Sequence, residues 1–183
     1  MTNMKAPTLI TPRLKLRAHL LSDFENVAAL WADPEVIRKI SGVPSTREQS
    51  WARLLRNVGH WSLLGFGFWV VETAEDSRFV GEVGLGSFKR DLKPSVPGIP
   101  EAGWVLSASE GGKGFATEAM DAVLQWIDTA RQFPTTFALF DPSHTASLRV
   151  AEKLGFAESS LVSFAGEPAL IRYRQRGARR MSV

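Results

Sequence analysis

The chain has 183 residues, no cysteine, 22 lysines and arginines against 19 acidic residues, and a formal net charge of +3. This length predicts one domain with a substantial core, and the lack of cysteine excludes disulfides, Cys-ligated metal sites and a thiol nucleophile. Neither a signal-peptide core nor an apolar run long enough to cross a bilayer is present, so we expect a cytoplasmic protein with no membrane partner.

The first 65 residues predict one strand followed by helices. Residues 10–17 alternate leucines with basic side chains, the period of a half-buried strand. Ser22 is a suitable N-cap for a helix, and a short second helix is expected over 34–40. A third helix begins at about Thr46 with a capping box. The side chains expected on its inward face are Trp51, Leu54, Leu55, Val58 and Trp61.

Beyond residue 65 the sequence alternates strands with two further helices. The predicted elements are strands over 66–73 and 79–88, a proline-rich loop over 89–100, a strand over 101–107, a helix from about 114, a strand over 134–140, a helix over 144–154, and an antiparallel pair over 157–164 and 168–174. Gly155 suits a left-handed C-cap. This order predicts a mixed α/β (α+β) fold in a single domain, 1–183.

The positive charge is concentrated at the C-terminus. Residues 172–183 contain five arginines and no acid, so the other 171 residues hold 17 basic and 19 acidic side chains, a formal charge of −2. This balance does not predict a general nucleic-acid surface. The basic tail, at about 176–183, either docks an RNA or acidic partner or is a solvated terminus.

The glycine-rich segment Gly111–Ala116 lies between a predicted strand and a long helix. Glycines there allow positive φ and close approach of the backbone to a ligand, and the N–H groups that open the helix favour an anion such as phosphate. The segment matches neither GxGxxG nor the P-loop. Taken alone, it is explained equally well by a flexible turn with small residues.

Two other segments of the chain support a functional interpretation of the glycine-rich segment. The chain starts with Thr11-Pro12-Arg13-Leu14-Lys15-Leu16-Arg17, and a helix from His144 ends in Leu154-Gly155-Phe156. In this order and spacing, the three segments resemble the GNAT N-acetyltransferases of the RimJ/RimL-type branch, over about residues 9–175. The resemblance implies a twisted, mostly antiparallel sheet flanked by helices, whose splayed central strands hold acetyl-CoA.

The resemblance also implies a set of cosubstrate contacts. The loop positions expected to wrap the pyrophosphate are Gly112, Lys113, Gly114, Phe115, Ala116 and Thr117. The positions expected on the splayed strand beside the pantetheine are Val105, Leu106 and Ser107, where a backbone N–H would polarise the thioester. Lys113 either adds a charge to the phosphates or is a solvated lysine. The side chains of Val105 and Leu106 are also expected to pack in the core.

The chain departs from the family pattern at three positions. Gly111 replaces a usual Gln or Arg, and His144 replaces a usual Asn, so both affect the expected affinity for the cosubstrate. Many members place a Tyr where this chain has Ala151. Ser147 is the candidate to hydrogen-bond the sulfur, with a local helix-start hydrogen bond as the alternative.

Acyl transfer to an amine needs a group that removes the amine proton. Glu101, at the start of the strand beside the acceptor cleft, is the first candidate, and Glu82 is the second. Either carboxylate could instead bind the ammonium while water takes the proton, or be a surface carboxylate. His19 and His60 receive no role. The three histidines do not predict a metal site, and no covalent-nucleophile motif is present.

We therefore expect an N-acetyltransferase that moves acetyl from acetyl-CoA to a primary amine by direct attack in a ternary complex. The resemblance suggests a protein N-terminal α-amine, for example of a ribosomal protein. The alternatives are a small-molecule amine (antibiotic, polyamine or amino acid) and a non-catalytic acyl-CoA-binding or RNA-associated module. A homodimer is compatible with the sequence. The N-terminal helices and the 89–100 loop should frame the cleft, with one or two of the aromatics Trp31, Trp51, Trp61, Phe66, Phe68 and Trp69 lining it.

Overall fold

A computed structural model describes residues 5–178 of the chain. The strands are β1 (Leu9–Ile10), β2 (Leu14–Arg17), β3 (Phe68–Thr73), β4 (Phe79–Gly86), β5 (Leu92–Lys93), β6 (Glu101–Leu106), β7 (Thr135–Phe140), β8 (Glu158–Phe164) and β9 (Glu167–Gln175). The helices are α1 (Phe24–Ala32), α2 (Pro34–Ile37), α3 (Arg47–Leu64), α4 (Phe115–Ala130) and α5 (Thr145–Lys153), with 3-10 turns η1 (Leu21–Asp23) and η2 (Ala108–Glu110). Within this described part, no helix is long and apolar enough to cross a membrane.

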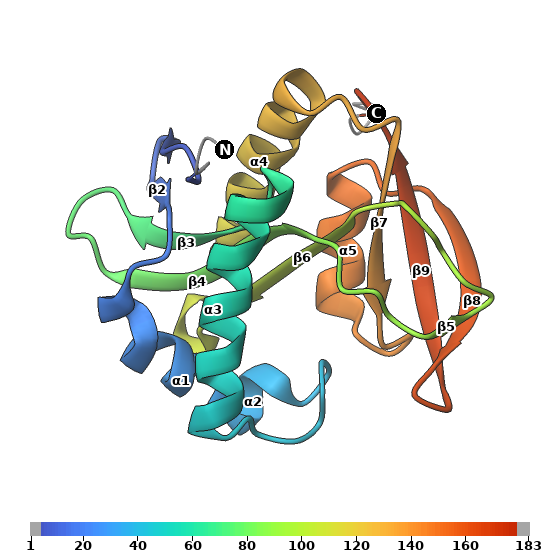
Figure 1. The fold of residues 1–183 in the computed structure, drawn as a ribbon, viewed down its shortest axis with the longest axis horizontal. Coiled ribbons are helices and arrows are strands. Elements are labelled where there is room, and N and C mark those ends of the chain that lie inside the picture. Colours follow the sequence, from blue (N-terminus) through green and yellow to red (C-terminus); the bar gives the residue numbers. More distant parts are fainter. Residues whose placement is uncertain (1–4, 179–183) are drawn as a thin grey trace.

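All nine strands form one sheet in the order β1-β2-β3-β4-β6-β7-β9-β8-β5. Every neighbouring pair is antiparallel except β6 and β7, which run parallel and pair only at Glu101 with Phe137 and Ala102 with Ala138. In Figure 1, β3, β4 and β6 run across the view, while β7, β9 and β8 run down it. The two halves of the sheet therefore diverge beyond Ala102, as the expected splayed fold requires.

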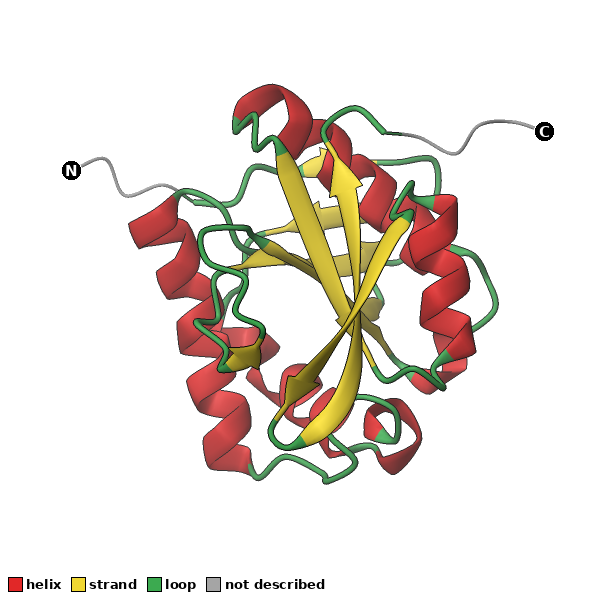
Figure 2. Cartoon of the chain, turned by 90° about the vertical axis from the view of Figure 1, so that its right-hand side faces the viewer, coloured by secondary structure: helices red, strands yellow, loops and turns green. Residues whose placement is uncertain are grey.

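Helices cover both faces of this sheet (Figure 2). On one face, α4 packs on β2, β4 and β6 through its buried stripe, which includes Ala119, Met120 and Val123. On the other face, α1 and α3 pack against each other and cover Val105 of β6. The cores on the two faces leave the diverging ends of β6 and β7 accessible between them.

Several predicted boundaries change in the structure. The strand expected over 10–17 is interrupted at Thr11–Arg13, which leaves β1 and β2. The helix expected from Ser22 begins with the η1 turn, and α2 ends at Ile37 rather than Ile40. The loop over 89–100 contains β5, which pairs with β8 and adds a short edge strand to the sheet.

The inward face of α3 was predicted wrongly in part. The capping box of Thr46 with Gln49 is present, and Leu54 and Trp61 are buried. However, Trp51, Leu55 and Val58 are exposed by 38%, 51% and 45%. The positions buried in their place are polar, namely Ser50, Asn57 and His60. The helix turns a polar face inward because it covers a buried carboxylate on β4.

The arginines of the C-terminal segment are partly structural. Arg172 and Arg174 belong to β9, and Arg174 is only 4% exposed. Its guanidinium donates to both oxygens of Asp128 on α4, at 2.9 and 2.7 Å, and the Gly177 N–H donates to the same carboxylate. Residues 179–183, most of the predicted basic tail, lie outside the described residues.

This buried ion pair predicts a large stability effect. Replacing Asp128 by Asn should lower the free energy of unfolding by about 3 kcal/mol, because Arg174 would remain buried without a counter-charge. Burial opposes ionisation of Asp128, but the bonds from Arg174 hold its pKa below the usual range. Its stabilisation is therefore present above about pH 4 and is lost as the pH falls through the lowered pKa. Urea unfolding at pH 7 and pH 3 measures both effects, and equal stability of the two proteins at pH 7 would contradict the prediction.

Candidate active site

The loop between β6 and α4 has the geometry of an anion site. Six consecutive N–H groups, from Gly112 to Thr117, have no acceptor within residues 5–178, and the first helical bond runs from the Glu118 N–H to the Gly114 carbonyl. Gly112 and Gly114 have φ of +76° and +82°, and a Cβ on Gly112 would meet nothing within 4 Å. These free donors at a helix N-terminus, beside open space, fit a pyrophosphate.

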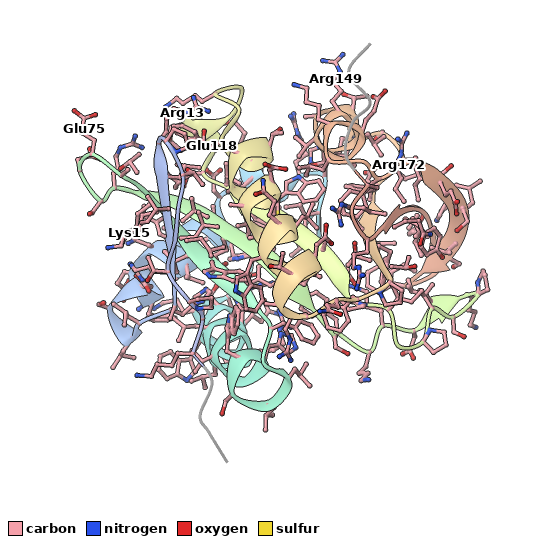
Figure 3. All side chains as sticks on the ribbon, turned by 90° about the horizontal axis from the view of Figure 1, so that it is seen from above. Arg13, Lys15, Glu75, Glu118, Arg149 and Arg172 are labelled. Carbon is pink, nitrogen blue, oxygen red and sulfur yellow. The ribbon has the colours of Figure 1, made fainter. Side chains whose placement is uncertain are left out.

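The N-terminal Thr-Pro-Arg segment holds this loop from outside. Thr11 Oγ1 donates to Glu118 at 2.6 Å, and Arg13 donates to the same carboxylate through its backbone N–H at 3.0 Å and through Nε at 2.7 Å. Arg13 also donates to the Lys113 carbonyl at 3.0 Å. Figure 3 shows Arg13 and Glu118 side by side at the start of α4. The motif therefore positions the loop backbone.

The Lys113 ammonium already has a partner. Its Nζ lies 3.1 Å from a carboxylate oxygen of Glu110, a buried side chain that also forms an ion pair with Arg78. Burial opposes ionisation of Glu110, but Lys113 and Arg78 hold its pKa below the usual range. The backbone N–H of Lys113, which has no acceptor in the described part of the chain, is therefore a better candidate for phosphate binding than its side chain, which is paired with Glu110.

The diverging end of β6 offers backbone groups to a ligand. The Ser107 N–H donates to the Val80 carbonyl of the β4 side at 2.9 Å. Backbone N–H and C=O groups point to alternate sides along an antiparallel pair. The groups of Val105 therefore also bond toward β4, whereas the N–H and C=O groups of Trp104 and Leu106 point toward the open edge. Of the three predicted residues, only Leu106 therefore presents its N–H to the opening. Trp104 is a second such residue, which the motif comparison did not single out.

A cleft of about 800 Å³ opens at this divergence, framed by the segment after α2, by α3, β4, β6 and β7, by the start of α5 and by the turn before β9. Its lining includes the sequence-predicted Glu82, Glu101, Val105, His144 and Ser147, and the aromatics Trp31 and Phe68. The 89–100 loop contributes Arg90 to this lining, and Phe88 lies just before the loop. Tyr173 is on β9 and is not among the lining residues, and Ala151 is buried in the core.

His144 and Ser147 form a pair at the N-terminus of α5. The Ser147 hydroxyl lies 3.0 Å from His144 Nε2. Burial lowers the pKa of His144, an effect that Asp141 partly offsets, so the imidazole is neutral at pH 7. A neutral ring can accept from the hydroxyl or donate to it. The residue that replaces the usual Asn thus orients Ser147 toward the cleft.

Glu101 is buried at the base of the cleft and is engaged by Arg90. Arg90 donates through Nε and one Nη to the two carboxylate oxygens of Glu101, at 2.6 and 2.8 Å. A carboxylate has about four lone-pair positions, so this fork leaves acceptor positions open. Glu101 can therefore still accept a hydrogen bond or a proton from an amine in the cleft.

Glu82 is more deeply enclosed than Glu101. It is 1% exposed, and it accepts from Trp31 Nε1 at 2.8 Å and Asn57 Nδ2 at 3.0 Å, with His19 Nε2 at 2.6 Å. Burial opposes its ionisation, but the bond to His19 keeps the pKa of Glu82 below its usual range. Nδ1 of His19 has no partner in the described chain. No sequence motif links His19 to Glu82, 63 positions away.

Within residues 5–178, no three His, Cys, Asp or Glu side chains are grouped as a metal site would need. The site is therefore made of a backbone anion cradle, a gap between two strands, a Ser–His pair and two buried carboxylates.

Comparison with known proteins identifies the family and the fold. The family profile described as an acetyltransferase (GNAT) domain matches residues 13–157. The protein YkkB of Bacillus subtilis is 29% identical over 94% of this chain and 98% of its own. A GnaT-family acetyltransferase structure from Bordetella pertussis is 30% identical, with a TM-score of 0.80, over 92% of this chain and 99% of that one. The fold is also shared with RimL, a ribosomal L7/L12 α-N-protein acetyltransferase solved with coenzyme A, at 13% identity and a TM-score of 0.70, over 92% and 98% of the two chains.

Proposed function

Since the chain belongs to the GNAT acetyltransferases, in the RimJ/RimL-type branch, we propose that it transfers acetyl from acetyl-CoA to a primary amine bound in the cleft. The observation that carries this proposal is that three features of the site adjoin one another. The anion cradle at Gly112–Thr117, the unpaired edge of β6 and a cleft with buried carboxylates lie along one path. That path can accept a pyrophosphate, a pantetheine arm and an amine in sequence.

We assign the cosubstrate contacts to the residues predicted for them. The free N–H groups of Gly112, Lys113, Gly114, Phe115, Ala116 and Thr117 bind the pyrophosphate. Of Val105, Leu106 and Ser107, Leu106 pairs with the pantetheine through its backbone, together with Trp104, while Val105 and Ser107 hold this edge to β4. An N–H on this edge, with Leu106 as the candidate, stabilises the oxyanion. His144 and Ser147 lie at the sulfur end of this path.

The reaction is a direct attack. The neutral amine nitrogen forms a C–N bond to the thioester carbon, the carbonyl becomes an oxyanion, and its collapse breaks the C–S bond. The proton lost by the amine goes to Glu101, directly or through water. The thiolate is stabilised by a hydrogen bond from Ser147 and leaves as the thiol after it takes up a proton from solvent, to which Glu101 returns the proton of the amine. The products are an N-acetyl amine and free CoA.

For the acceptor, we propose a primary amine, with a peptide N-terminal α-amine as the first candidate and a small-molecule amine as the second. The test is release of free CoA thiol from acetyl-CoA in the presence of a panel of peptides and amines, with the acetylated product identified by mass spectrometry. CoA binding without turnover of any acceptor would contradict acetyl transfer and favour a non-catalytic acyl-CoA-binding protein.

Replacing Ser147 by Ala should lower kcat about tenfold with little change in the amine KM, because one hydrogen bond to the developing thiolate is lost. His144→Asn is the matched control for Ser147→Ala, since Asn is the usual residue at this position in the RimJ/RimL-type branch and its amide can still orient Ser147. It should keep most of the activity. Steady-state kinetics with the best acceptor measure both, and full activity of the Ala variant would remove Ser147 from the mechanism.

A further inference from the structure

Two arginines of α3 line the cleft without a carboxylate partner. Arg53 and Arg56 are three residues apart and so share one face of the helix. Arg53 is half-buried and has only a long hydrogen bond of 3.4 Å, to the Ser45 hydroxyl. Arg56 is exposed, and within residues 5–178 neither arginine forms an ion pair. By contrast, Arg90 on the same cleft is paired with Glu101.

Aromatic rings hold these guanidinium groups in place. The Arg53 guanidinium lies 3.6 Å from the centre of the Trp31 ring, and that of Arg56 lies 5.1 Å from the Phe88 ring. Phe88 also contacts Arg90, at 4.9 Å. Stacking uses the flat face of a guanidinium and leaves its N–H groups available at the edge, the arrangement that suits planar recognition of a carboxylate or phosphate.

The arginines of the cleft repel one another. Burial, followed by repulsion from Arg56, lowers the pKa of Arg53 to about 10. Although Arg56 is exposed overall, the part of its side chain that lies within the cleft loses water, and this desolvation, followed by repulsion from Arg90, lowers its pKa as well. Glu82 opposes both shifts only in part, and its oxygens already accept from Trp31 and Asn57. The cleft therefore has a surplus of positive charge that a bound anion would relieve.

We propose that the acceptor amine carries an anionic group, a carboxylate or a phosphate, which Arg53 and Arg56 bind while its amine lies at Glu101. The two ends are neighbours, because the Phe88 ring contacts both Arg56, at 5.1 Å, and Arg90, at 4.9 Å, and Arg90 is paired with Glu101. This inference rests on the proposed function, since it takes the cleft as the acceptor site. It favours amino acids, acidic peptides or phosphate monoesters as acceptors. It disfavours polyamines and aminoglycosides, because they are positively charged like the arginines and would be repelled by them.

The first experiment measures anion binding without catalysis. The protein is saturated with CoA, so that its anion loop is filled, and is then titrated with succinate or inorganic phosphate by calorimetry. We expect millimolar binding that weakens at least about tenfold in the Arg53→Gln/Arg56→Gln double variant. Arg47→Gln is the matched control, because Arg47 starts the same helix but pairs with Glu25 on the surface. Equal binding of both anions to the wild type and the double variant would overturn the proposal.

The second experiment compares matched acceptors at equal concentrations of neutral amine. The pairs are glycine and glycinamide, the tripeptide amides Ala-Asp-Ala and Ala-Asn-Ala, and phosphoethanolamine and ethanolamine, so that each source of the anion has its own arm. At least one anionic member should be favoured about thirtyfold in kcat/KM over its neutral partner, and this ratio should fall to about one in the double variant. Acetylation of neutral and anionic members at equal rates would overturn this inference and leave acetyl transfer standing. Failure to bind CoA would count against the proposed function instead.

Discussion

Replacing Gly112 by Val should weaken CoA binding on the order of 10³-fold, about 4 kcal/mol. Gly112 has a φ of +76°, a region that a β-branched residue rarely adopts, and its Cα faces open space. A valine would either fill the space that the pyrophosphate needs or rotate the backbone and turn N–H groups away. Each charge-assisted hydrogen bond lost is worth about 1.5–3 kcal/mol, so two are enough for the expected effect.

The control for this variant is Gly98→Val. Gly98 also has a positive φ, +75°, and a Cβ there would meet nothing within 4 Å, but it belongs to the 89–100 loop and does not line the cleft. The two substitutions therefore carry similar backbone strain at sites of different expected function. Calorimetry with CoA should show normal affinity for Gly98→Val. A similar loss in both variants would mean that strain alone explains it, and retained affinity of Gly112→Val would contradict the assigned loop.

Local sequence signals predicted the helix ends and the buried helix face that depend on neighbouring residues alone. The capping box at Thr46 and the left-handed glycine at position 155 mark real helix ends. The helical period of α4 is matched by its buried stripe. The divergence of β6 and β7 could be expected only from the family resemblance, because no residue in either strand shows by itself where pairing stops.

The polar interior of the site could not be predicted in the same way. Apolar periodicity assumes that the buried face of a helix is hydrophobic, but α3 covers Glu82 and therefore turns Asn57 toward it, leaving Trp51 and Leu55 outside. The bond of His19 to Glu82 also joins residues that are distant in sequence. Such pairs are specified by tertiary packing, so composition and spacing carry no signal for them.

Net charge was the least informative quantity. Five arginines raise the net charge within residues 172–183, but one of them, Arg174, lies on β9 as a buried partner of Asp128 rather than in the predicted tail at about 176–183. The charge that bears on function is instead the local surplus of Arg53 and Arg56 within the cleft. A formal charge of +3 hides this surplus because acidic side chains elsewhere cancel it.

Replacing Glu101 by Gln should lower kcat/KM on the order of 10³-fold, because general-base catalysis of this kind contributes about 10²–10⁴-fold. The variant keeps the volume of the side chain and can still accept one bond from Arg90, so the fold should persist. Thermal unfolding checks this. In contrast, Glu82→Gln should mainly lower stability, because a buried amide would set its own N–H donors against those of Trp31, Asn57 and His19.

The ion pair with Arg90 supplies the test that separates catalysis from structure. If Glu101 only fixes Arg90, then Glu101→Gln, Arg90→Gln and the double variant should all lose a similar amount of kcat/KM, because each removes the same interaction. If Glu101 acts on the amine, the loss of kcat/KM should be far larger in Glu101→Gln than in Arg90→Gln, because the Arg90→Gln variant keeps the Glu101 carboxylate available to the acceptor. Equal losses in the three variants would therefore return Glu101 to a structural role and leave proton removal to water.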